Sequence, residues 1–272
     1  MTRRIDDPTD GAGSAGDASP AGDLVILKLG GSLITEKDHP ETLDDDALSA
    51  ACDAIASALH DGAISRLVVV HGAGSFGHHH ASKHGLSTTA GTYDAGAVID
   101  VHGTMKTLNR FVLSRLHERN VSAVPVHPLS VSARPDGVDG DLDLPVSSTA
   151  TLLEEGFTPV LHGDGVATAD AGVTVVSGDE IVVELARSLE ARRVGVCSTV
   201  PGVLDDDGNV IRTIGSFETV ADVLGGSDAT DVSGGMEAKV RELLALDAPA
   251  SVFGADGLTG FLRGEDPGTR IE

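Results

Sequence analysis

The chain has 272 residues, with 42 acidic and 19 basic side chains and a formal net charge of −23. This length allows one large domain or two fused lobes with a substantial core, so disulfides are not needed for stability. No basic patch is present that could displace counterions from nucleic acid. No apolar run approaches the ~20 residues that a membrane-spanning helix requires.

The basic residues are unevenly divided between the two types, because 14 are arginine and five are lysine. A strongly acidic chain of this kind is typical of proteins that work at high internal salt. At 1 M salt the Debye length is ~3 Å, so repulsion among the surface carboxylates is screened. Lysine is therefore scarce enough that each one needs a reason. The five are Lys28, Lys37, Lys83, Lys106 and Lys239.

The first 22 residues are rich in Gly, Ala, Asp and Ser and are predicted to form a disordered acidic tail. Arg3 and Arg4 are followed by acidic residues rather than by an apolar segment, so we expect no signal peptide. Two cysteines, Cys52 and Cys197, are too few for a disulfide framework and favour a reducing, cytoplasmic location.

Beyond the tail, apolar runs of strand length alternate with segments of helical periodicity. Strands are predicted at 24–29, 67–70, 121–126, 158–161, 193–197 and 251–253. Helices are predicted at 44–59, 91–119 (which Gly96 or Gly103 could break), 147–155, 177–190 and 235–246. Residues 166–176 are predicted to form a β-hairpin that turns at 170–172.

This alternation predicts an α/β fold, an αβα sandwich with a mostly parallel central sheet covered by helices on both faces. Because no linker interrupts the middle of the chain, two lobes, 23–160 and 161–272, are expected to share one continuous sheet. In such sheets ligands bind at the carboxyl ends of the strands.

The first special loop, residues 28–32, closes the first strand and contains Lys28 and two glycines, with Lys37 nine residues further on. Glycines let the backbone approach a phosphate closely, and lysine supplies charge. An ordinary strand-to-helix turn with an exposed lysine is an equally good interpretation of this loop alone. The loop matches neither GxxxxGK[ST] nor GxGxxG.

The second loop, residues 71–80, has three glycines in six residues and ends in three histidines. Its open backbone is predicted to wrap an anion, with one histidine donating to phosphate. A zinc or copper site at His78, His79 and His80 is an alternative, but three consecutive residues cannot all face one ion. We therefore expect one functional histidine and two incidental ones, and no protein-bound metal.

Two further loops open helices. Ser177 and Glu180 match a capping box, and Gly178 with Asp179 at the same helix start could bind an anion or hold lysines. Residues 231–239 contain two glycines followed by Lys239, a cation near a helix N-terminus, where an anionic ligand would favour it.

Five motifs occur in a fixed order between residues 24 and 271: LKLGGSLITEK, VVHGAGSFGH, HGDG, VSGDEIVVELA and DVSGGMEAK. In this order they resemble the amino-acid kinase superfamily, and GAGSFGH is similar to its isopentenyl phosphate kinase branch. The resemblance implies transfer of the ATP γ-phosphoryl group to isopentenyl phosphate, giving isopentenyl diphosphate for an archaeal variant of isoprenoid biosynthesis. It also implies a homodimer, an acceptor-binding N-terminal lobe and a nucleotide-binding C-terminal lobe, with Mg²⁺ carried by the nucleotide.

The resemblance also implies roles for individual residues. Lys37 would stabilise the transferring group, His78 would hold the acceptor phosphate, and Asp179 would orient the lysines. Ala73, Gly74 and Gly178 would lie near the acceptor phosphate. The nucleotide would be bound by Lys28, Gly30, Gly31, Ser32, Gly74, Thr199, Gly234 and Lys239. The apolar acceptor tail is expected between residues 79–86 and the helix near Val98.

One departure concerns the nucleotide site. The family commonly has T-D-V-D-G after the strand at 193–197, whereas residues 198–202 here are Ser-Thr-Val-Pro-Gly, without either acid.

Other functions remain alternatives. A fosfomycin-kinase-like enzyme shares the histidine loop, and UMP kinase, which also phosphorylates a phosphate, lacks it. Acetylglutamate, glutamate and carbamate kinases have acceptors that do not require His78. A non-catalytic nucleotide-binding protein and a zinc-binding protein are the alternatives from other classes.

Overall fold

The computed structural model describes residues 23–221 and 235–272. The strands are β1 Leu24–Leu29, β2 Arg66–His71, β3 Ala123–Pro125, β4 Ala133–Arg134, β5 Thr158–His162, β6 Asp164–Thr168, β7 Gly172–Val176, β8 Arg193–Ser198, β9 Thr213–Ile214, β10 Ala250–Gly254 and β11 Thr269–Ile271. The helices are α1 Gly31–Ile34, α2 Asp45–His60, α3 Gly74–Lys83, α4 Ala95–His117, α5 Ser147–Glu154, α6 Gly178–Ser188, α8 Gly235–Leu244 and α9 Leu258–Leu262. The predicted tail at 1–22 and residues 231–234, the first part of the loop at 231–239, lie outside the described residues.

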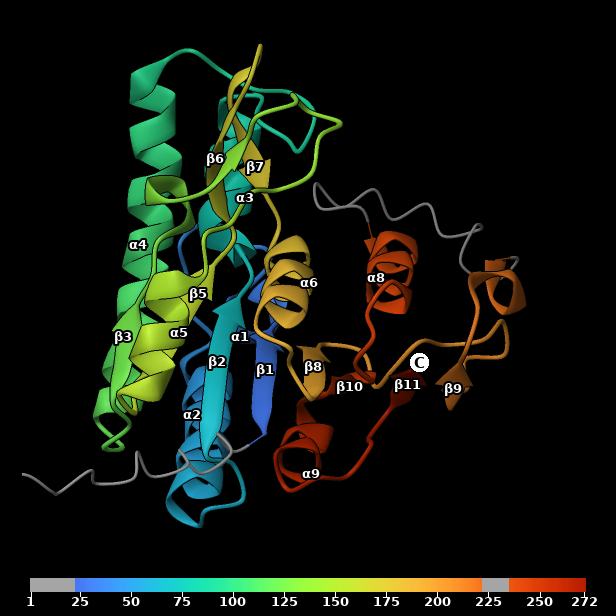
Figure 1. Cartoon of the computed structure of the whole chain (residues 1–272). Coiled ribbons are helices and arrows are strands. Elements are labelled where there is room, and N and C mark those ends of the chain that lie inside the picture. Colours follow the sequence, from blue (N-terminus) through green and yellow to red (C-terminus); the bar gives the residue numbers. More distant parts are fainter. Residues whose placement is uncertain (1–22, 222–234) are drawn as a thin grey trace, which may run out of the picture.

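The main sheet has eight strands in the order β3-β5-β2-β1-β8-β10-β11-β9 (Figure 1). Neighbouring strands are parallel throughout, except for the antiparallel pair β10 and β11. Helices α5, α6 and α8 cover one face, while α1, α2, α4 and α9 cover the other. The predicted αβα sandwich with a mostly parallel sheet is confirmed.

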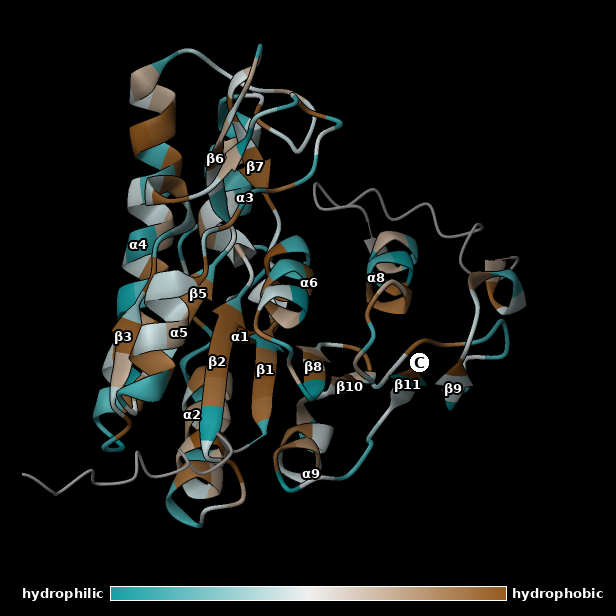
Figure 2. Cartoon of the chain, in the orientation of Figure 1, coloured by the Kyte–Doolittle hydropathy of each residue, from teal (hydrophilic) through white to brown (hydrophobic). Residues whose placement is uncertain are grey.

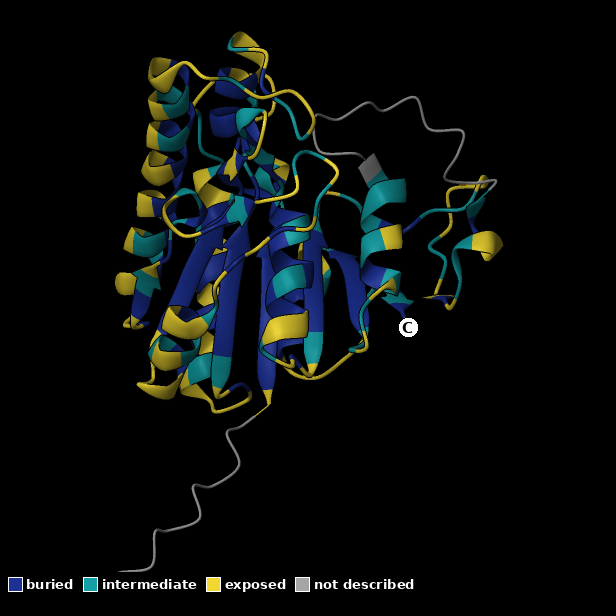
Figure 3. Cartoon of the chain, turned by 45° about the horizontal axis from the view of Figure 1, so that its top comes forward, coloured by how far each residue is buried: buried dark blue, intermediate teal, exposed yellow. Residues whose placement is uncertain are grey.

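The strand sequences explain this architecture. In β1, Leu24 and Ile26 pack on the α6 side, whereas Val25, Leu27 and Leu29 pack on the α2 side. Figure 2 shows the central strands as hydrophobic and Figure 3 shows them as buried, with exposed residues on the outer faces of the helices. A strand buried on both faces needs a continuous apolar run, because each buried side chain contributes roughly 1.5–3 kcal/mol.

The two long helices that begin with an aspartate cap follow the predicted pattern with one correction. The Asp44 side chain accepts a hydrogen bond from the Ala47 N–H, and α2 runs to His60 close to the predicted end. The expected break in α4 is absent, since the helix is continuous from Ala95 to His117. Gly96 lies at the capped start, where its N–H donates to Asp94, and Gly103 lies on an open face.

The second glycine-rich loop is shorter than the sequence suggested. Its open part consists of Gly72 and Ala73, because α3 begins at Gly74. Phe76 is buried in the core under this helix, and Gly77 packs so close to the Met105 Sδ of α4 that a side chain would collide with it. Tertiary packing therefore makes a helix of a segment with weak helical propensity.

The predicted hairpin at 166–176 is confirmed as β6 and β7, which pair from Asp164 with Val176 to Thr168 with Gly172. Asp170 and Gly172 have positive φ angles of 59° and 76°, as a tight turn requires. With β4 the hairpin forms a second, three-stranded sheet. In the part of the chain that the structure describes, no helix is long and apolar enough to cross a membrane.

Candidate active site

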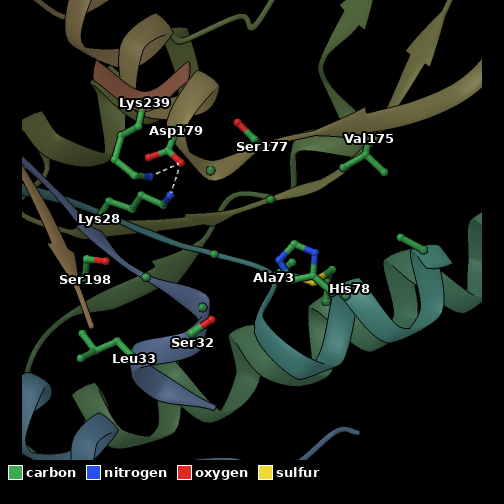
Figure 4. Close-up of a pocket in the computed structure, with 18 of the residues that line it drawn as sticks. Lys28, Ser32, Leu33, Ala73, His78, Val175, Ser177, Asp179, Ser198 and Lys239 are labelled. Atoms are coloured by element: carbon green, nitrogen blue, oxygen red, sulfur yellow. Dashed lines mark hydrogen bonds and ion pairs between the residues drawn. The ribbon is translucent and has the colours of Figure 1, made fainter. Parts of the chain in front are cut away.

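A cavity of about 500 Å³ lies at the carboxyl ends of β1, β2 and β8 (Figure 4). It brings together eleven of the residues singled out in the sequence: Lys28, Gly30, Gly31, Ser32, Lys37, Ala73, His78, Gly178, Asp179, Thr199 and Lys239. Gly74 instead lines a smaller adjoining cavity, to which Ser32, Lys37 and His78 also contribute. Gly234 lies outside the described residues.

Asp179 joins two lysines from opposite ends of the chain. Its Oδ2 accepts hydrogen bonds from Lys28 Nζ, at 2.5 Å, and from Lys239 Nζ, at 2.7 Å (Figure 4). All three side chains are at most 14% exposed. The other oxygen, Oδ1, is buried and has no hydrogen-bond partner among the described residues. The cluster has two positive charges and one negative charge, which leaves it positive at the mouth of helix α6.

The pKa values follow from this arrangement. Burial lowers the pKa of Lys28 to about 8, and the neighbouring Asp179 carboxylate opposes that shift. Burial alone would raise the pKa of Asp179, but the two ammonium groups hold it below its usual range. Lys28 thus remains mostly protonated at pH 7 because of Asp179.

The start of α6 places Asp179 in the site. Ser177 caps the helix by accepting a hydrogen bond from the Glu180 N–H at 3.0 Å. The expected capping box is only half formed, since the Glu180 carboxylate pairs with Arg134 instead of returning to Ser177. A Cβ at Gly178 would lie 3.2 Å from Lys28 Cε, so the glycine leaves room for the lysine to reach Asp179.

The first two glycine loops contact each other through bare backbone. A Cβ on Gly31 would lie 2.1 Å from the Gly74 nitrogen, and one on Gly72 would lie 2.5 Å from the Gly31 nitrogen. Hydrogen bonds from Gly30 N–H to Cys197 O and from Gly72 N–H to Leu29 O hold the loops at adjacent strand ends. These glycines are therefore needed for packing as well as for access to an anion.

The opposite end of the cavity is apolar. Ala81 from α3, Val101 and Met105 from α4, and Val175 from β7 line it. His78, on α3, projects into the cavity between this apolar end and the Lys28 and Asp179 end (Figure 4). The cavity thus suits a ligand with an anionic head and a short hydrocarbon tail.

The three consecutive histidines have different environments, as their spacing on a helix requires. His78 lines the cavity, His79 is exposed, and His80 is buried between Glu41 and Asp100. Within residues 23–221 and 235–272, no group of three or more His, Cys, Asp or Glu side chains could hold a metal ion. That His80 is buried between two carboxylates was not indicated by the sequence.

A second group of histidines was missed in the sequence. His71 and His162 end the adjacent strands β2 and β5 in register, and their rings stack at 5.4 Å. Each Nδ1 donates to the carbonyl of the glycine that follows, Gly72 at 3.0 Å and Gly163 at 2.9 Å. The signal was the repeated His-Gly-x-Gly at 71–74 and 162–165, which begins at the last residue of two neighbouring strands.

Two further histidines, His127 and His102, extend this group. His162 Nε2 lies 2.9 Å from His127 Nδ1, and His102 Nδ1 donates to the buried carboxylate of Asp164, which lines the cavity. Burial lowers the pKa of His71 to about 3 and that of His127 to about 4. The His71 and His127 rings are therefore neutral at pH 7, with tautomers set by their hydrogen bonds.

The chemistry available at this site is the binding of phosphorylated ligands, through two buried ammonium groups, an exposed Lys37 and an imidazole beside glycine-rich backbone. A family model described as the amino acid kinase family matches residues 23–246. The chain belongs to the amino acid kinase family and, on the similarities that follow, to its isopentenyl phosphate kinases.

The chain is 59% identical to the isopentenyl phosphate kinase of Haloferax volcanii over 91% of this chain and 98% of the relative. It is 34% identical to the isopentenyl phosphate kinase of Methanothermobacter thermautotrophicus, over 82% of this chain and 86% of the relative. A solved structure described as an X-ray structure of isopentenyl phosphate kinase superposes with a TM-score of 0.77 at 28% identity, covering 92% of this chain and all of the other.

Proposed function

We propose that the protein transfers the γ-phosphoryl group of ATP to isopentenyl phosphate, forming isopentenyl diphosphate and ADP. The observation that carries this proposal is a single cavity that has the Lys28, Lys239 and Asp179 cluster at one end, His78 in the middle and an apolar wall at the other end. The similarity to isopentenyl phosphate kinases supports it.

The reaction needs charge neutralisation more than proton transfer. The second pKa of a phosphate monoester is ~6, so the attacking acceptor oxygen is largely deprotonated at pH 7 and needs no general base. That oxygen forms the new bond to the γ-phosphorus while the bond to the β–γ bridging oxygen breaks, and ADP leaves with the electron pair. Lys28, Lys37 and Lys239 would stabilise the charge on the transferring group, and His78 would hold the acceptor phosphate.

The residues present fit ATP. Lys28, Gly30, Gly31, Ser32 and Lys239 lie together on one wall and offer ammonium groups and open backbone to phosphates. Thr199 extends that wall toward the segment that lacks the two family acids.

Mg²⁺ would be held by the nucleotide phosphates rather than by a protein cage, and it would neutralise charge on the β- and γ-oxygens. The unpartnered Asp179 Oδ1 is suited to accept a hydrogen bond from a metal-bound water.

The apolar end of the cavity selects the proposed acceptor. A five-carbon prenyl tail would lie against Ala81, Val101, Met105 and Val175, while its phosphate reaches His78 and the neighbouring Ala73 and Gly178. UMP would place a polar base and ribose against that wall, which leaves their hydrogen-bonding groups unpaired. The cavity therefore favours a small hydrocarbon phosphate.

A phosphoryl-transfer assay tests the proposal directly. The protein, in molar KCl with Mg-ATP, would be given isopentenyl phosphate, dimethylallyl phosphate, UMP or fosfomycin. We expect diphosphate formation from the prenyl phosphates with the highest kcat/KM for isopentenyl phosphate. Turnover of fosfomycin or UMP alone would establish another kinase, and nucleotide binding without turnover of any acceptor would indicate a non-catalytic protein.

Changing Lys37 to alanine is expected to lower kcat by about 10²-fold with little change in the acceptor KM, because its charge acts mainly on the transferring group. His78→Ala is the contrasting variant and should raise the KM for isopentenyl phosphate more than it lowers kcat. Steady-state kinetics at saturating Mg-ATP separate the two effects. Wild-type kinetic constants in either variant would contradict that residue's role.

We also propose that residues 23–160 form most of the acceptor site and residues 161–272 most of the nucleotide site, within the shared sheet. Lys28 and residues 30–32 would reach across to the nucleotide phosphates, and Val175 and Gly178 to the acceptor. We propose a homodimer, supported by exposed apolar side chains on or beside α4, with Tyr93 79%, Ile99 68% and Phe111 37% exposed. Light scattering in molar KCl should give about twice the 27.7 kDa chain mass. A measured mass equal to that of one chain, with no difference between the wild type and Ile99→Lys, would contradict the dimer.

The acidic surface and the two free, buried cysteines, Cys52 and Cys197, support a cytoplasmic protein that works at high salt.

A further inference from the structure

Lys37 is presented by a short hairpin that follows α1. Thr35 and Leu43 form an antiparallel bridge, and the Glu36 N–H donates to Thr42 O at 3.0 Å. Lys37 lies near the tip, where its exposed side chain lines the cavity. Because the tip is exposed, the position of the lysine depends on what holds the hairpin.

The hairpin rests on the start of α3. Thr42 N–H donates to Ser75 Oγ at 3.3 Å, and Ser75 N–H donates to Thr35 Oγ1 at 2.9 Å. Glu41, four residues after Lys37, has a positive φ of 52° and turns its carboxylate toward α3. Its Oε1 lies 2.8 Å from His80 Nε2.

His80 links that carboxylate to α4. Its Nδ1 lies 2.9 Å from Asp100 Oδ2, so each ring nitrogen faces a carboxylate oxygen. Ionised carboxylates only accept hydrogen bonds, so both nitrogens carry hydrogen and the ring is an imidazolium. The side chain is 10% exposed, against 50% for Glu41. His80 lines neither cavity.

The groups around His80 are arranged to keep it charged. Asp100, on α4, also accepts hydrogen bonds from Lys83 Nζ and His84 Nε2, both at 2.8 Å. On another side of His80, the His79 ring packs edge-on at a centroid distance of 5.2 Å. Burial alone would lower the pKa of His80, but the hydrogen bonds to Asp100 and Glu41 raise it above its usual range.

We propose that His80 is a positioning residue for phosphoryl transfer. As an imidazolium between Glu41 and Asp100, it fixes the hairpin to α3 and α4 and thereby holds Lys37 beside the transferring group. The inference rests on the proposed function and adds to it a residue that touches neither substrate. Turnover then depends on the charge of His80 although His80 faces away from the cavity.

The test compares His80→Gln with His60→Gln, a change of the same kind at an exposed histidine of α2 that lines neither cavity. Both are assayed with Mg-ATP and isopentenyl phosphate in molar KCl from pH 6.5 to 9.5. We expect kcat of His80→Gln to fall about tenfold, with the acceptor KM little changed, and His60→Gln to remain near wild type. Both proteins should lose kcat as Lys28, with a pKa of about 8, gives up its proton. The wild type alone should show a further fall as the pH rises through the raised pKa of His80.

A second pair of variants separates positioning of Lys37 from general damage. In a Lys37→Ala background, His80→Gln should lower kcat no further, and Glu41→Gln in the wild-type background should reproduce the His80→Gln loss. Thermal unfolding of each variant in the same buffer shows which variants are folded. If His80→Gln is unfolded, Glu41→Gln tests the inference instead, because Glu41 is half-exposed and its replacement disturbs the core less.

Equal kcat in His80→Gln and His60→Gln, or an equal loss with and without Lys37, would overturn the inference. Wild-type turnover of isopentenyl phosphate in the same assay would leave the proposed function intact. Absence of wild-type turnover with isopentenyl phosphate would instead overturn the proposed function and this inference with it.

Discussion

Replacing Asp179 by asparagine is expected to lower kcat/KM by about 10²–10³-fold, because removing one preorganised electrostatic group from an active site typically costs that much in rate. Asparagine has the same shape but no charge, so the ammonium groups of Lys28 and Lys239 would lose the carboxylate charge that they share. Burial already lowers the pKa of Lys28 to about 8, and without the carboxylate it would fall further. Lys28 would then lose charge near neutral pH, when the phosphates need it.

The matched control is Glu180→Gln, the same change at the next residue of α6. Glu180 pairs with Arg134 and does not contact either lysine, so this variant should lose some stability but keep nearly all turnover. Kinetics are measured with Mg-ATP and isopentenyl phosphate, and circular dichroism melting checks that both variants are folded. A folded Asp179→Asn protein with wild-type kcat/KM would show that the shared carboxylate charge is not needed.

Acid is expected to unfold the protein because of the neutral histidines at the strand ends. The folded-state pKa of His71, about 3, lies below its ordinary value of 6.5. A depressed histidine pKa contributes stability that is complete above pH 6.5 and is lost as the pH falls toward 3. At pH 4 the loss from His71 alone is about 3 kcal/mol. His127 acts in the same direction down to a pKa of about 4, and burial also lowers the pKa of His162.

Urea unfolding in molar KCl from pH 7.5 to 4.5 measures this effect. The free energy of unfolding should fall by about 1.4 kcal/mol per pH unit for each histidine that is protonated only in the unfolded chain. His60→Gln, at the exposed end of α2, should leave that slope unchanged. A free energy that stays constant between pH 7.5 and 4.5 would contradict neutral, buried imidazoles.

Much of the fold could be predicted because its strands are buried on both faces. β1 at Leu24–Leu29 matches its predicted bounds, since both faces of a parallel strand must be apolar and the run is visible in the sequence. β4 and β9, at two residues each, and β11, at three, are too short to show a period. Helix α3 was missed because its stability comes from packing Phe76 and Gly77 on other elements rather than from its own residues.

The candidate site was partly visible for a different reason. Lysine is scarce in this chain, so Lys28, Lys37 and Lys239 stood out, and the motif resemblance grouped them with Asp179. The contact of His80 with Glu41 and Asp100 could not be predicted, because it joins residues 39 and 20 positions apart. Nothing local in the sequence distinguishes His80 from His79, and only their places on α3 do so.

The contact between Gly31, Gly72 and Gly74 has a consequence for how the enzyme could diverge. The proposed donor and acceptor loops meet where not even a methyl group fits, so main-chain atoms alone set the gap between the two substrates. Substitutions at the apolar wall can then change which tail is accommodated while the distance that the phosphoryl group travels stays the same. Acceptor preference and transfer geometry are thus encoded by separate sets of residues.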